Sequence, residues 1–182
     1  FREITEKVSA LEEFSQPHPL SAKIAVANLK KYIVDDRYKI RLHDLVISET
    51  EKSFAELNDK NFPVQGQFSK EELINRVRRY EALSEIVLSL IINGCYWGDK
   101  KNEGLWAKCL DRIANLEGER SGLVVWINLK LYPALLILYC GGIASIAAER
   151  YGNFASSIIK PKIKDGSKDE PIMSALYTWH VM

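Results

Sequence analysis

The sequence lacks an excess of charge of either sign, and its first 65 residues contain no glycine. The 182 residues include 25 basic and 24 acidic side chains, which leaves a net charge of +1. Proteins dedicated to nucleic acid usually show a clear basic excess, so a nucleic-acid partner is conceivable but not favoured. Hydrophobic residues make up 47% of the chain, a balance that indicates a folded domain rather than a disordered one.

Cysteine is scarce, and the spacing of Cys95, Cys109 and Cys140 matches neither a disulfide framework nor a zinc motif. We interpret the three as reduced thiols of a cytoplasmic protein. The chain also lacks a glycine-rich phosphate loop, a G-x-S-x-G motif and an H-E-x-x-H motif. We therefore expect no cofactor and no bound metal.

The chain opens at Phe1 without an initiator methionine and without the apolar core of a signal peptide. This start predicts that the chain is part of a longer polypeptide. An upstream domain in that polypeptide would be one of its partners.

The scarcity of helix breakers predicts an all-α fold. Apolar residues recur at spacings of three and four, as in Leu73, Val77 and Tyr80, which places them on one face of a helix. Ser69 and Glu72 form a capping box that starts this helix, and Gly94 is its expected stop. The expected helices cover residues 1–16, 21–34, 37–58, 69–93 and 105–116. In the alternative, one continuous helix over residues 21–58 replaces the second and third of these.

An apolar run follows at residues 123–148, and its last 18 positions, 131–148, carry no charge. That length reaches the threshold for a membrane span, so a membrane-associated domain is one interpretation. In the other, Pro133 opens a hydrophobic helix that the amphipathic helices cover on all sides. We favour this multi-helix bundle with a central hydrophobic helix.

The last part of the chain is rich in charge and in turn-forming residues. Residues 160–170 are predicted to form a loop, and 158–163 is the only weak candidate for a strand. The sequence therefore predicts a helical domain over residues 1–160 and a linker with a C-terminal tail over 161–182.

The only pattern that suggests catalysis is the Arg-x5-His spacing of Arg37 and His43. This spacing resembles the active-site pattern of helical HEPN-type ribonucleases, in which the two residues act on an RNA phosphodiester. Tyr38 departs from that family, which usually has a small polar residue after the arginine. A solvated basic helix face is the simpler interpretation.

Two further groups are candidates for binding. Arg76, Arg78 and Arg79 could hold a phosphate or an acidic partner, although glutamates one turn away can pair with them. Large aromatic residues are enriched at interfaces, and Trp97 and Trp179 stand near a loop or a chain end. We expect these two tryptophans to face a protein partner.

Residues 131–139, 142–144 and 149–151 resemble a helical region near the C-terminal end of some bacterial multidomain proteins. Those proteins carry an effector or nucleotide-handling domain upstream, and some belong to defence against phage. The resemblance covers about 30 residues and carries over no catalytic residue. It implies a non-catalytic accessory domain for assembly or partner sensing, through a protein partner or self-association.

Overall fold

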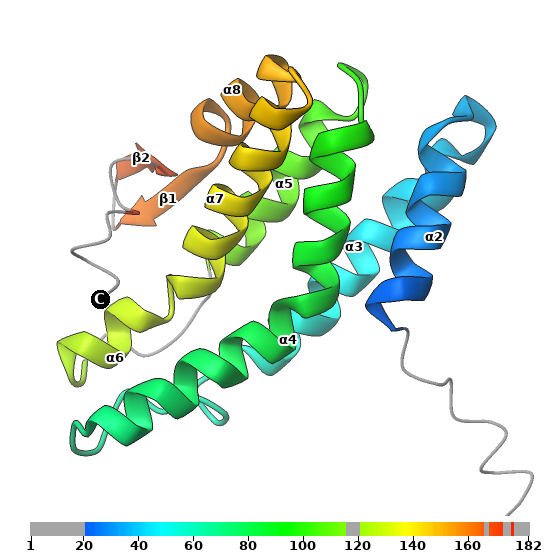
Figure 1. The fold of residues 1–182 in the computed structure, drawn as a ribbon. Coiled ribbons are helices and arrows are strands. Elements are labelled where there is room, and N and C mark those ends of the chain that lie inside the picture. The colour runs from blue at the N-terminus through cyan, green and yellow to red at the C-terminus, as the bar shows by residue number, and fades with distance from the viewer. Residues whose placement is uncertain (1–20, 116–120, 166–167, 173–175, 177–182) are drawn as a thin grey trace, which may run out of the picture.

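The computed structural model describes residues 21–115, 121–165, 168–172 and 176, and it confirms the predicted all-α class (Figure 1). The described helices are α2 (Ala22–Ile33), α3 (Lys39–Glu56), α4 (Lys70–Trp97), α5 (Glu103–Ala114), α6 (Val124–Leu129), α7 (Tyr132–Ala147) and α8 (Tyr151–Ile159). A 3-10 turn at Asp36–Tyr38 and a small hairpin of β1 (Lys162–Asp165) and β2 (Lys168–Pro171) complete the described elements. The helix expected over residues 1–16 lies outside the described residues.

Local side-chain caps set where the first described helices begin. The Ser21 hydroxyl accepts a hydrogen bond from the backbone N–H of Ile24, which satisfies one of the free donors at the start of α2. The Asp35 carboxylate likewise accepts from the backbone N–H of Arg37 at 3.0 Å and caps the 3-10 turn before α3. Two separate helices are therefore present, and the alternative of one helix over residues 21–58 is wrong.

The long helix α4 begins as predicted but ends later. The Ser69 hydroxyl accepts from the backbone N–H of Glu72 at 3.1 Å, as the capping box requires. The helix then continues through Gly94 to Trp97, so the predicted stop at Gly94 is wrong. Gly94 serves instead as a close-packing position, because a Cβ atom added there would lie 2.3 Å from the ring of Trp106 on α5.

The helices pack in two layers around α4. In Figure 1, α2, α4 and α7 lie side by side, with α3 and α5 behind them and α8 against α7. The main core lies between these layers and contains buried residues of α2, α3, α4, α5 and α7, including Leu29, Val46, Leu90, Trp106 and Ile137, and Ile158 of α8 packs against it. A smaller core gathers Phe62, Tyr80 and Trp126 where α6 meets the early part of α4.

The hydrophobic helix of the bundle is α7, and Pro133 lies in its first turn as predicted. It packs against α4, α5 and α8. The expectation that its neighbours cover it on all sides is wrong, because Tyr139, Ile143 and Ile146 are exposed along one face.

The charged segment predicted to be a loop contains the antiparallel hairpin, in which Lys162 pairs with Pro171 and Asp165 with Lys168. Of the weak strand candidate at 158–163, the first residues belong to α8 and only the last two lie in β1. Ile172 and Leu176 after the hairpin are buried in the main core. The predicted linker is thus attached to the helical body, while the domain boundary at residue 160 stays a prediction.

Candidate functional site

Arg37 and His43 each lie beside a different carboxylate. Arg37 is exposed in the turn before α3, where its guanidinium bonds to both oxygens of Asp35, the shortest contact being 2.6 Å. This bond holds the pKa of Asp35 below its ordinary value. His43 is half exposed on α3, and its Nδ1 lies 3.5 Å from a carboxylate oxygen of Asp44. Neither residue lines either of the two pockets described below, so the nuclease interpretation stays a prediction.

The arginine cluster on α4 has a structural use. Arg76 is 5% exposed, donates to Glu72 at 2.6 Å and to the Pro63 carbonyl at 2.7 Å, and stacks over the Trp126 ring at 4.1 Å. Its planar group thereby ties the loop before α4 to α6.

Arg79 lies one turn after Arg76 on α4 and contacts the same loop. It donates to the Asn61 carbonyl at 2.9 Å and lies 4.5 Å from the centre of the Phe62 ring. Arg78 is exposed, and among the described residues no side chain is bonded to it. Two of the three arginines proposed for binding, Arg76 and Arg79, are therefore engaged within the protein, although Arg79 is exposed like Arg78.

Trp97 is exposed at the end of α4, as a residue that contacts a partner would be. Its ring meets Tyr96 edge-on at 4.9 Å, and the Lys30 ammonium lies 5.8 Å from its centre. The second predicted tryptophan, Trp179, lies outside the described residues.

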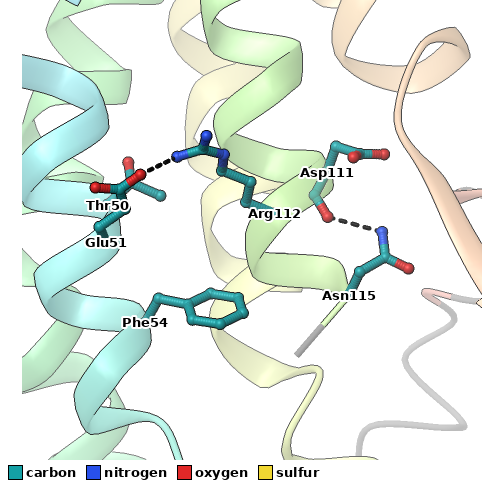
Figure 2. Close-up of a pocket in the computed structure, with 6 residues that line it drawn as sticks. All are labelled: Thr50, Glu51, Phe54, Asp111, Arg112 and Asn115. Carbon is teal, nitrogen blue, oxygen red and sulfur yellow. Dashed lines mark hydrogen bonds and ion pairs between the residues drawn. The ribbon is translucent and has the colours of Figure 1, made fainter. Parts of the chain in front are cut away.

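A pocket of about 350 Å³ lies between α3 and α5 (Figure 2). It is lined by Thr50, Glu51, Phe54, Asp111, Arg112 and Asn115. Glu51 and Arg112 form an ion pair of 2.7 Å across it, and the Asn115 amide donates to the Asp111 carbonyl at 2.8 Å. The Asp111 carboxylate also accepts from the backbone N–H of Lys162 at 3.0 Å, so the polar groups that line this pocket are bonded within the protein.

A second pocket of about 270 Å³ lies where the α4–α5 turn meets the α7–α8 turn. Its buried residue Asn153 donates to the carbonyls of Cys95 and Gly98, at 3.0 and 3.2 Å. The Glu103 carboxylate accepts from Ser156 at 3.1 Å. Within the described ranges, the structure contains no group of three His, Cys, Asp or Glu residues that could hold a metal ion.

The most unusual surface of the molecule is apolar and lies on α7 and α8. Its large side chains are between 49% and 70% exposed. We call this surface the α7–α8 face, and it consists of Tyr139, Ile143, Ile146, Tyr151, Ala155 and Ile159.

The contacts of neighbouring residues place both halves of this face on one side of the protein. On α7, Gly141 faces α4, because a Cβ atom added there would lie 3.1 Å from Ile91. On α8, Asn153 also faces α4, through its bonds to the Cys95 and Gly98 carbonyls. Ile143 lies two positions after Gly141, and Ala155 lies two positions after Asn153. Two positions correspond to about 200° round a helix, so both exposed residues point away from α4.

The two halves are joined directly. A Cβ atom added at Gly142 would lie 3.2 Å from the Phe154 ring, so α7 and α8 touch along their shared edge. Neither helix contains a charged residue, and Glu149, Arg150 and Lys160 stand at the ends of α8. The result is a continuous face two helices wide without charge.

The sequence analysis identified the uncharged run over 131–148 but expected the other helices to cover it, so it did not predict this surface. The α8 half also had a signal, because Tyr151, Ala155 and Ile159 recur every fourth residue without an intervening charge.

By length and composition, the stretch Val124–Ala147, which covers α6 and α7, could cross a membrane, and it is the one such stretch among the described residues. In its most apolar 18-residue window, 56% of the residues are buried inside the protein. The core helix of a water-soluble protein meets the same criteria, so this observation is weak evidence for a span.

Comparison with protein-family models, curated proteins and solved structures gives no match for this chain. The function is therefore argued from the described surface and pockets.

Proposed function

We propose that this chain is a non-catalytic helical accessory domain for assembly or partner sensing in a larger bacterial protein, and that it acts through the α7–α8 face. The single observation that supports this role is the exposure of a continuous, uncharged face on two adjacent helices. Helices on the surface of a globular protein normally present charged residues to water, and these two do not.

The size of the face supports binding. Its five large side chains are roughly half to two-thirds exposed, and at ~200 Å² each they leave ~600 Å² of mostly apolar surface in water. The largest apolar patch on a typical monomer is ~300–600 Å² and is often functional. The α7–α8 face is at the upper end of that range, a size that is often functional.

The polar groups of the described residues do not suggest chemistry. Those in the α3–α5 pocket are bonded within the protein, and the cysteines with the deepest burial are poor nucleophiles. Burial raises the pKa of Cys95 and of Cys109 to about 11, so both remain thiols near neutral pH. These features favour a binding role over catalysis.

A membrane-associated domain is the second candidate, because the apolar stretch Val124–Ala147 is long enough to span. The nuclease is less favoured, since Arg37 would have to leave Asp35 before it could reach a phosphodiester.

The proposal is tested with Ile143→Lys, which places a charge in the middle of the face. Ile40→Lys is the matched control, because Ile40 is 76% exposed on α3 and lies outside the face. Residues 1–182 are purified without detergent, and light-scattering mass and binding of an apolar dye are compared. We expect Ile143→Lys to change at least one of the two readouts, and Ile40→Lys to change neither.

Two results would refute the proposal. If Ile143→Lys matched the wild type in both mass and dye binding, the face would not be a binding surface. If the wild-type chain floated with phosphatidylcholine vesicles on a density gradient, the membrane candidate would replace it.

A further inference from the structure

We infer that the partner of the α7–α8 face is a second copy of this chain, which forms a two-fold symmetric dimer. This inference rests on the proposed binding role of the face and names its partner. It is carried by the area of the face, by its lack of charge and by the arrangement of its two helices.

The exposed area fits what a stable dimer needs. Standard protein interfaces bury ~800 Å² per partner. The five large side chains of the face supply about three-quarters of this area by the estimate of ~600 Å² given above. Small exposed residues beside them, including Ala147, Gly152 and Ala155, add to the contact surface.

The face is also suited to meeting itself. In a two-fold dimer the same patch is present on both sides, so a charge near the axis would face its own copy. The α7–α8 face has no charged residue, and its two exposed tyrosine hydroxyls can both donate and accept hydrogen bonds. Two identical faces can therefore meet without like-charge repulsion.

The helix pair offers a regular way to pack. Because α7 and α8 lie side by side and present their apolar stripes in the same direction, two copies would bring four helices together around one apolar layer. Tyr139 and Ile143 are four positions apart on α7, and Ala155 on α8 is a small residue between Tyr151 and Ile159 in the same four-residue spacing. Rows of this spacing are the ones that interdigitate when helices pack.

The edges of the face fit a membrane surface less well. Anionic lipids attract clusters of basic residues beside an apolar helix face. Here Glu149 and Arg150 stand next to each other with opposite charge, and Lys160 lies at the other end of α8. The opposite side of α7 is closed against α4 at Gly141, so lipid could reach only one side of the helix.

The test is sedimentation equilibrium of residues 1–182, without detergent, for the wild type, Ile143→Lys and the control Ile40→Lys. We expect the wild type and Ile40→Lys to have twice the mass of the chain. Because a two-fold interface contains position 143 twice, we expect Ile143→Lys to raise the dissociation constant at least ~100-fold. Circular dichroism checks that the variant folds, and Ile146→Lys repeats the test at a second position of the face.

Each other result has a distinct meaning. The wild type could stay monomeric up to ~100 μM while Ile143→Lys lowers its binding of an apolar dye. This result would overturn the second copy as the partner, while the proposed binding role would stand. A dimer that Ile143→Lys and Ile146→Lys both leave unchanged would show that another surface is used, and would overturn the inference. A chain that stays in solution only with lipid would overturn both the dimer and the proposed function.

Discussion

Gly94→Ala is expected to destabilise this protein, although alanine is the better helix former. Gly94 lies inside α4, where replacing glycine by alanine ordinarily gains about 1 kcal/mol. Here the new Cβ atom would lie 2.3, 2.5 and 2.7 Å from three carbon atoms of the Trp106 ring. Trp106 is 1% exposed, so its ring has little room to move.

The two effects have opposite signs, and the steric one is larger. Overpacking a closed core costs about 1–3 kcal/mol and occasionally more, and distances this short place Gly94 at the upper end. We expect a net loss of about 2 kcal/mol in the free energy of unfolding. For a chain of this length the loss lowers the melting temperature by about 4–8 °C.

Urea unfolding followed by circular dichroism measures this loss. Gly104→Ala is the control, because Gly104 is an exposed helical glycine on α5 with no atom within 4 Å of an added Cβ. It should leave stability unchanged or raise it by up to about 1 kcal/mol. In a Trp106→Leu background, Gly94→Ala should lose most of its cost, since the ring it strikes is gone. A Gly94→Ala variant as stable as the wild type would refute the steric argument.

Further predictions concern the arginine cluster and the thiols. Arg76→Met should lower the free energy of unfolding by about 2 kcal/mol, because it leaves the Pro63 carbonyl and the Glu72 carboxylate without their donor, whereas Arg78→Met on the exposed side should change it by less than about 0.5 kcal/mol. At pH 8 a thiol reagent should modify Cys140 first and reach Cys95 and Cys109 only in urea; fast reaction of all three would contradict their burial. Because burial raises the pKa of Cys95 and Cys109 from 9.0 to about 11, the unfolded chain loses these protons first, so stability should fall as the pH rises from 9 to 11. Replacing both by alanine should make the urea midpoint fall less steeply over that pH range, and the remaining fall comes from Tyr80 and Tyr132, because burial raises the pKa of these tyrosines too.

The sequence by itself determined where α2, the turn before α3, α4 and α7 begin. Ser21, Asp35 and Ser69 accept bonds from backbone N–H groups two or three residues later, and Pro133 lies in the first turn of α7. Such signals act within one helical turn, so they can be read from neighbouring residues. The all-α class follows from the same local information and from the helical spacing of apolar residues.

Only the tertiary structure decided the remaining features. Gly94 reads as a stop, but the Trp106 ring on α5 needs a residue without a side chain there, and α4 continues. The arginine cluster reads as a binding site, but Arg76 packs on Trp126, which is fifty positions away in the chain. Apolar composition shows that residues 131–148 avoid water, yet it does not show which of their sides another helix covers. That depends on how α4, α5 and α8 are placed around α7, and this arrangement leaves the α7–α8 face exposed.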